Sequence, residues 1–193
     1  MPIDPSILSD EEVMQQSLAN TAFFEQIVLR YEQKLSSYIR RLGVHTHEDR
    51  QDVLQDIFIK VYKNLNGFDT SLSFSSWIYR IAHNEAISWY RKKHVRPEGH
   101  MVTESEDILE LQSSPELTAE KLFDEGINAE EVQRALTSVN QKYRDALILR
   151  FFEHKEYDEI GDILKIPTGT VGTLIHRGKQ ELKAKLNTLH IHV

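Results

Sequence analysis

Apolar residues recur at steps of three and four along most of the chain, which is the spacing of amphipathic helices. The first run covers residues 24–42, and Gly43 follows it as a helix stop. A second run covers residues 54–65. A third helix is predicted to begin at Ser75 or Ser76, because a serine hydroxyl caps the first turn of a helix well. No stretch alternates strictly enough between apolar and polar residues to predict a strand.

The helical pattern is interrupted once, in the middle of the chain. Residues 96–128 are rich in proline, serine and acidic residues, which is the composition of a linker. Helical spacing resumes afterwards. The predicted fold is therefore all-α, with two small helical domains at 15–95 and 129–190 joined by an acidic linker at 96–128.

Charge is distributed very unevenly along the chain. The net charge is −7, but residues 101–131 hold ten acids and one base and so carry −9, which leaves the remainder at +2. An overall acidic balance therefore does not exclude nucleic acid as a partner of the two ends. Three hypotheses stand for the function of the acidic segment 101–126. It could be a mimic of nucleic acid, a spacer that only adds solubility, or a segment that folds back on the basic residues 91–96.

Several classes of protein are excluded or disfavoured by what the sequence lacks. There is no cysteine, no apolar run of membrane-spanning length and no basic, apolar leader at the N-terminus, so we expect a cytoplasmic protein without membrane insertion. The histidine pairs 45/47 and 190/192 have no further ligands in the sequence, and no nucleotide-binding or nucleophile motif is present. We therefore predict no metal, no cofactor and no enzymatic activity.

The segment "YDEIGDILKIPTGTVGTLIHRGKQELKAKL" has the pattern of a helix-turn-helix. A short apolar-faced helix is followed by Pro167, which cannot continue it, and Thr168 is a good cap for the next, longer helix. Hydroxyls and cations left off the apolar face of the second helix suit contacts with DNA phosphates and bases. The candidate DNA-contacting residues are Thr168, Thr170, Thr173, His176, Arg177 and Lys179. The plain alternative is a helical hairpin with a solvated face.

The segment "FSSWIYRIAHNEAISWYRKKHVR" interleaves aromatic and basic residues. Rings stack on unpaired bases while cations follow a nucleic-acid backbone, so the pattern favours binding to single-stranded DNA. The alternative is that the tryptophans are core residues and the cations a solvated helix end. Just upstream, in "EDRQDVLQDIFIKVYKNL", the polar residues Asp52, Gln55 and Asp56 lie off the apolar stripe, a face suited to docking a large partner.

Together these motifs, in this order and at this distance, resemble those of bacterial RNA polymerase sigma factors of the extracytoplasmic-function (ECF) group. The resemblance covers about residues 20–95 and 130–188. It implies a specificity subunit that binds core RNA polymerase and promoter DNA, with a probable anti-sigma factor as a further partner. By this resemblance, Asp52, Gln55 and Asp56 bind the polymerase clamp, and Trp77, Arg80, Asn84 and Arg91 bind the −10 element. The loop 66–73 binds a flipped base, and the six candidate residues of the last helix bind the −35 element.

Three positions depart from the family pattern. Lys165 stands in the turn where glycine is usual, the run 172–174 lacks the usual cations, and His83 stands where arginine is common. With fewer phosphate contacts, we expect weaker and less salt-dependent −35 binding than is typical of the family. The alternative function is a stand-alone helix-turn-helix regulator that binds operator DNA.

Overall fold

The computed structural model describes residues 8–69, 73–94 and 129–190, and within these ranges the chain forms helices and no strand. The elements of the first two ranges, here called the N-terminal unit, are α1 (Asp10–Ala19), α2 (Phe24–Arg41), α3 (His47–Asn64) and α4 (Phe74–His94), with 3₁₀ turns at Thr21–Phe23 and Leu65–Gly67. Those of the last range, the C-terminal unit, are α6 (Ala129–Thr137), α7 (Gln141–Phe151), α8 (Tyr157–Leu164) and α9 (Thr168–His190). The all-α prediction is confirmed.

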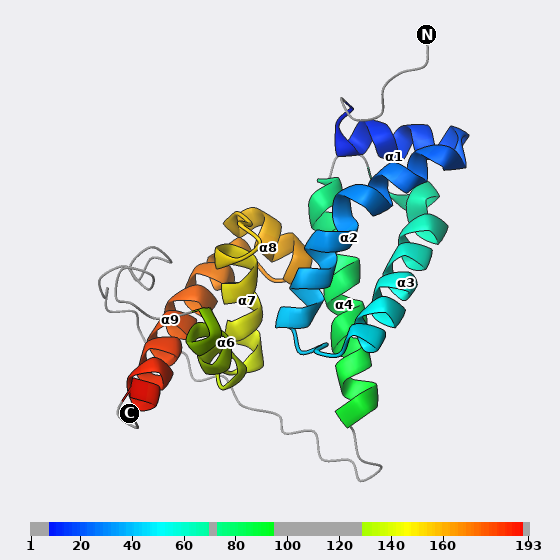
Figure 1. The fold of residues 1–193 in the computed structure, drawn as a ribbon. Helices are drawn as coiled ribbons and strands as arrows, with labels where there is room; N and C mark the ends of the chain where they lie inside the picture. The colour runs from blue at the N-terminus through cyan, green and yellow to red at the C-terminus, as the bar shows by residue number, and fades with distance from the viewer. Residues whose placement is uncertain (1–7, 70–72, 95–128, 191–193) are drawn as a thin grey trace.

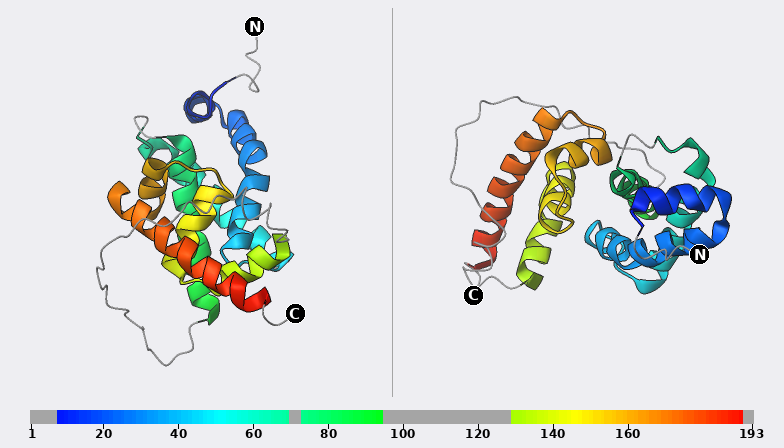
Figure 2. Two further views of the ribbon diagram at one scale, coloured as in Figure 1. Left: turned by 90° about the vertical axis from the view of Figure 1, so that its left-hand side faces the viewer. Right: turned by 90° about the horizontal axis from the view of Figure 1, so that it is seen from above.

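The two units lie side by side, with α8 and the end of α7 against α2 and α4 (Figure 1). Two further views show the same arrangement (Figure 2): α3 lies on the side of the N-terminal unit that faces away from the C-terminal unit, and α9 lies on the far side of the C-terminal unit. The predicted acidic linker, including the segment 101–126, lies outside the described residues, as do residues 70–72 of the loop 66–73.

The N-terminal unit is a helical bundle around a fully enclosed core. Leu35, Tyr38 and Ile39 of α2 are buried against Ile57 of α3 and Ile78 of α4. These are the positions that the helical spacing assigns to the inner faces. The run of α2 stops as expected, since Gly43 adopts a φ of +113° that suits a residue without a side chain.

Helix α1 also belongs to this unit, although the apolar spacing gives no sign of it. It begins after Ser9, whose hydroxyl accepts the backbone N–H of Glu12 while the Glu12 carboxylate accepts the N–H of Ser9. This capping box holds the first turn. The helix then buries Val13 and Met14 in the common core. The carboxylate of Glu11 accepts the backbone N–H of Phe74 at the start of α4, at 3.1 Å.

Two predicted caps are wrong by one to three residues. Helix α4 begins at Phe74, and the hydroxyl that accepts the N–H of Ser76 belongs to Ser73, so Ser75 and Ser76 lie in the first turn rather than before it. Helix α9 likewise begins at Thr168 itself. At α4 three serines follow closely in the sequence and the first of them accepts the N–H, whereas at α9 the residue before the helix is Pro167, whose carbonyl oxygen accepts the N–H groups of Thr170 and Val171.

Candidate nucleic-acid and polymerase interfaces

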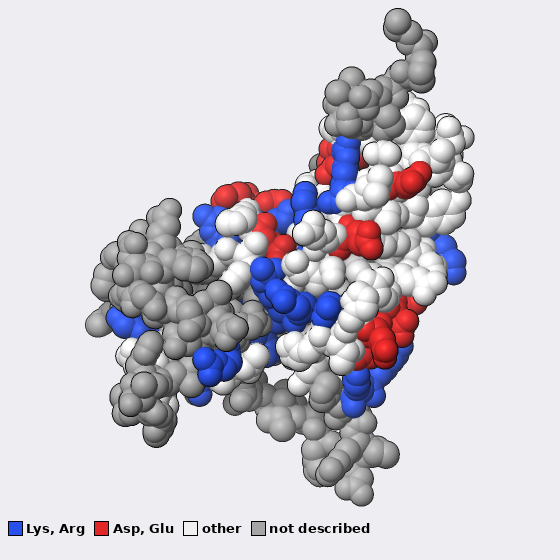
Figure 3. Space-filling model, in the orientation of Figure 1, with Lys and Arg blue, Asp and Glu red and all other residues white. Residues whose placement is uncertain are grey.

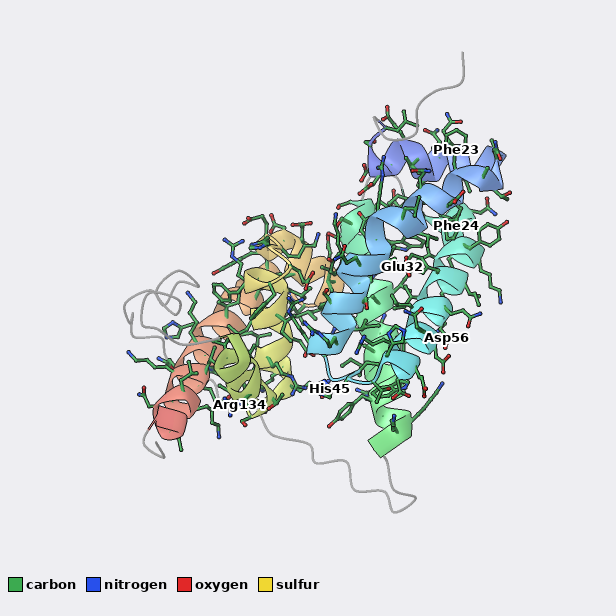
Figure 4. All side chains as sticks on the ribbon, in the orientation of Figure 1. Phe23, Phe24, Glu32, His45, Asp56 and Arg134 are labelled. Carbon is green, nitrogen blue, oxygen red and sulfur yellow. The ribbon has the colours of Figure 1, made fainter. Side chains whose placement is uncertain are left out.

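The predicted polymerase-binding residues lie together on an open face of α3. Asp52, Gln55 and Asp56 are all exposed, because Val53, Leu54 and Ile57 take the inner face of the same helix. Asp56 lies on the outer side of α3, away from the C-terminal unit (Figure 4). The structure thus brings the three polar side chains onto one surface that nothing else in the described chain covers.

The predicted −10 residues lie along α4 but differ in their surroundings. Asn84 and Arg91 are exposed, and Arg80 is half-buried. Trp77 belongs to an aromatic cluster, with ring centroids 5.0 Å from Phe68 and 5.6 Å from Phe74. Its indole is therefore held rigidly and only part of it is open to a base.

Not every cation near the end of α4 is available to DNA. The ammonium of Lys93 pairs with the carboxylate of Asp49 on α3 at 2.5 Å and lies 4.7 Å from the ring centroid of Trp89. This pairing holds the pKa of Asp49 below its usual value. Arg91 and Lys92 beside it are exposed. The basic end of α4 thus contains one cation engaged within the protein and two that face solvent.

The C-terminal unit contains a helix-turn-helix formed by α8 and α9. The turn is tight: a Cβ on Gly161 would lie 3.0 Å from the carbonyl oxygen of Ile166. Lys165 closes α8 in the left-handed conformation, with φ 56° and ψ 48°, which explains why glycine suits this position better. The inner face of α9 carries Val171 and Ile175, both buried as predicted.

Further along, α9 crosses α7 at close range. A Cβ on Gly178 would lie 3.0 Å from side-chain atoms of Leu147 and 3.2 Å from Cβ of Tyr143. Gly178 therefore lies in close contact with α7. A larger side chain there has no room, so this glycine fixes the position of α9 on the unit.

The six predicted −35 residues share the outer side of α9. Thr168 and Thr170 are exposed, whereas Thr173, His176, Arg177 and Lys179 are half-buried. Some of these side chains also have contacts within the chain: a ring nitrogen of His176 lies 3.1 Å from Nε2 of Gln180, and Nζ of Lys179 lies 5.2 Å from the ring centroid of Phe151. The first turn of α9 is the most open part of this surface.

A further group of polar residues, at the junction of the two units, was not predicted. The carboxylate of Glu153, in the turn between α7 and α8, accepts hydrogen bonds from Arg41 Nη1 at 3.1 Å and from the Tyr79 hydroxyl at 2.8 Å. Lys155 donates to the hydroxyl of Ser75 at 2.6 Å. In the sequence, a run of charges in a short turn looks like a solvated loop, and only the docking of the two units shows otherwise.

The junction also contains a buried acid. Asp145 of α7 is 5% exposed, and its Oδ2 lies 3.8 Å from Nε2 of His83 on α4. Burial raises the pKa of Asp145 to about 7 and lowers that of His83 to about 4. The other ring nitrogen of His83 lies 3.1 Å from the hydroxyl of Tyr38. An acid directly before the apolar run "ALILRFF" and the histidine at position 83 were the sequence signals that this surface holds something unusual.

Basic side chains gather between the two units on the face seen in Figure 3, over the region where α7 approaches the end of α2. No group of three or more His, Cys, Asp or Glu that is suited to hold a metal ion occurs among residues 8–69, 73–94 and 129–190. Within the same ranges no helix has the length and apolar character that crossing a membrane requires.

Comparison with known proteins agrees with this architecture. Residues 27–96 match the family described as Sigma-70 region 2, and residues 129–182 match Sigma-70, region 4. The chain is 33% identical over 171 residues to the ECF RNA polymerase sigma factor SigW of Bacillus subtilis, covering 86% of this chain and 90% of that protein.

Two solved structures share the fold at 22% identity. One is CnrH in complex with the cytosolic domain of CnrY, with a TM-score of 0.68 over 93% of this chain and 97% of that one. The other is the sigma factor RpoE in complex with the anti-sigma factor NepR from Bartonella quintana, with a TM-score of 0.62 over 85% and 96%.

The family matches on the two helical units place the chain among transcription initiation factors of the sigma-70 type. It belongs to the ECF RNA polymerase sigma factors. As a sigma factor, it directs RNA polymerase to promoters and so initiates transcription.

Proposed function

We propose that this sigma factor divides its task among three helices. The acidic and amide side chains of α3 bind the clamp coiled coil of core polymerase, α4 melts and reads the −10 element, and the start of α9 contacts the −35 element. The observation that carries this proposal is that all three helices keep these polar side chains outside the core while their apolar faces are buried. The proposed domains are residues 15–95, extended at its start by the part of α1 from Asp10, and 129–190, with the linker at 96–128.

The chemistry of each surface suits its proposed partner. Carboxylates on α3 repel DNA but pair with basic groups on a protein. Half-open aromatic and exposed basic groups on α4 suit a melted strand, since bases stack and phosphates pair with cations. Hydroxyls and backbone N–H groups at the start of α9 suit phosphates of duplex DNA. None of these roles involves bond-making by the chain, so we infer that it is not itself an enzyme and that it acts in the cytoplasm, beside polymerase and DNA.

The test is a titration of labelled protein with bacterial core RNA polymerase, read by fluorescence anisotropy, followed by run-off transcription on fragmented genomic DNA. We expect tight binding and a limited set of transcripts. Asp56→Arg should weaken polymerase binding by tenfold or more, whereas Glu32→Arg, the same change of charge at an exposed position of α2, serves as a control for charge alone. Specific binding to duplex DNA without any polymerase binding would instead support the stand-alone regulator.

An anti-sigma factor is the proposed further partner. RpoE of Bartonella quintana, which shares the fold, was solved with such a protein. A partner of this kind is expected to cover the proposed binding surfaces of both units at once. Neither unit can then reach polymerase or DNA. Affinity purification of the tagged chain from its own cells, followed by mass spectrometry, identifies the partner; recovery of polymerase subunits alone would contradict the proposal.

A further inference from the structure

At the junction between the two units, beside the packing of α8 on α4, one carboxylate receives donors from two helices. The side chain of Glu153 is only 6% exposed, yet it lies in a short turn at the edge of the C-terminal unit. Arg41 reaches it from the end of α2 and Tyr79 from α4, so the carboxylate joins these two helices of the N-terminal unit to the C-terminal unit. Charge-assisted hydrogen bonds of this kind are the strong ones.

Neighbouring contacts are centred on the same turn. The ammonium of Lys155 donates to Ser75 and lies 4.7 Å from the ring centroid of Tyr79. The guanidinium of Arg41 lies 4.9 Å from the ring centroid of Phe152. The turn at residues 152–155 thus contacts both α2 and α4.

A second part of the junction opposes closure. Oδ1 of Asp145 and Nε of Arg144 are buried and form no hydrogen bond; they lie 4.0 Å from each other, and Asp145 lies 3.8 Å from His83, both longer than a hydrogen bond. A buried polar group without a partner regains hydration when the surfaces part. The junction therefore combines a favourable contact at Glu153 with an unfavourable one at Asp145, as in interfaces whose two sides separate.

The closed arrangement is too short for both promoter elements. The −10 and −35 elements lie about 25 base pairs apart, or roughly 85 Å along the duplex. A compact chain of 193 residues has a diameter of roughly 40 Å. The two units must therefore separate before α4 and α9 reach their elements together, and the connecting residues 95–128 are long enough, at roughly 110 Å when fully extended.

We propose that Glu153 is a self-inhibitory latch: its bonds to Arg41 and Tyr79 hold the free sigma factor closed, and only the open form engages polymerase and promoter together. The second half of this statement rests on the proposed function, whereas the latch itself does not. A ligand that binds one of two states gains apparent affinity as that state becomes more populated. Weakening the latch should therefore tighten polymerase binding without any change at the binding surfaces.

The latch is tested by single-molecule energy transfer between dyes on the two units. The chain has no cysteine, so the exposed positions Glu32 on α2 and Lys183 on α9 can be labelled cleanly as Glu32→Cys and Lys183→Cys. We expect the wild-type sequence to show mainly high transfer. Glu153→Lys places a second cation beside Arg41, and the two positive charges repel each other. This variant should lower the ratio of closed to open molecules at least tenfold.

Charge-swap rescue separates a latch from simple misfolding. Adding Arg41→Glu to Glu153→Lys restores an ion pair of opposite polarity and should recover high transfer. Asp162→Lys makes the same kind of charge change at an exposed position of α8 and should leave the transfer unchanged. A Glu153→Lys protein that is folded by circular dichroism and still closed overturns the latch, and so does a failure of rescue.

The regulatory half is tested by titrating the same variants with core polymerase. Glu153→Lys should bind with a several-fold lower apparent Kd than the wild type, and the rescued double variant should return to the wild-type value. Open molecules with an unchanged Kd would overturn the inhibitory role while leaving the latch intact. If the wild type does not bind polymerase at all, the proposed function fails, and the energy-transfer result still decides whether the latch exists.

Discussion

Nε2 of His83 on α4 lies 3.8 Å from Oδ2 of Asp145 on α7, and both side chains are almost fully buried where the two units meet. Their pKa values are shifted in opposite senses. Asp145 has a pKa of about 7 against an ordinary 3.8, and His83 one of about 4 against an ordinary 6.5, in both cases because burial disfavours the charged form. The pair therefore affects how the closed arrangement of the two units depends on pH and how stable this arrangement is.

The first prediction concerns pH. Relative to a state in which both groups face water, the closed state binds more protons at Asp145 from about pH 4 to 7 and fewer at His83 from about pH 4 to 6.5, so the two effects nearly cancel. In the variant His83→Gln, Asp145 is the only one of the two groups that still titrates. Closure should then weaken as pH rises from 5 to 7, by up to roughly tenfold per pH unit, and change no further above pH 8.

Energy transfer between the labelled units across this pH range provides the measurement. The other ionisable groups around the pair are the Tyr38 hydroxyl on α2, Arg144 beside Asp145, and Glu153 in the turn after α7. Asp145→Asn in the His83→Gln background is the control, because it removes the titrating acid. A pH dependence that persists in this double variant would contradict the assignment to Asp145.

The second prediction concerns the stability of the closed form. Asp145→Asn keeps the shape of the side chain but removes a buried charge whose Oδ1 has no hydrogen-bond partner. We expect the closed form to gain about 1 kcal/mol or more at pH 8, where the acid is ionised in the wild type. Urea unfolding at pH 8 and pH 6 measures the effect, which should be larger at pH 8. A loss of stability at both pH values would show that the carboxylate is well solvated in solution.

The third prediction concerns the turn of the helix-turn-helix. Lys165 has φ 56°, a conformation that costs a residue with a side chain about 1 kcal/mol relative to glycine. Lys165→Gly should raise the free energy of unfolding by up to this amount, and Lys165→Ala should leave it almost unchanged. Thermal unfolding of the two variants distinguishes the backbone effect from loss of the lysine charge, since both variants lose that charge.

The fourth prediction compares two glycines of α9. Gly178→Leu places a side chain against Leu147 and Tyr143, which are packed in the unit, and should destabilise the protein by about 1–3 kcal/mol or more. Gly169→Ala meets no atom within 4 Å and should stabilise the helix by up to about 1 kcal/mol. Urea unfolding gives both values. Equal effects at the two positions would mean that α9 is not held against α7 as described.

Apolar spacing at three and four residues was sufficient to predict most helices, the all-α fold and the inner face of α9, because helix faces follow from local periodicity. It did not reveal α1, whose signal is the cap formed by Ser9 and Glu12 rather than a strong apolar stripe. The candidate surfaces on α3 and α9 were also readable, since a polar residue off an apolar stripe is outside the core whichever helices pack against that stripe.

The tertiary structure alone decided what meets at the junction of the two units. Glu153 and Arg41 are 112 positions apart in the chain, and Tyr79 is 74 positions from Glu153. No local pattern encodes such a meeting, because the energy of an ion pair depends on distance and burial rather than on separation along the chain. The sequence by itself thus determined the helices and the kind of protein, whereas only the docking of the two units brought Glu153, in a turn of ordinary charged residues, into contact with Arg41 and Tyr79.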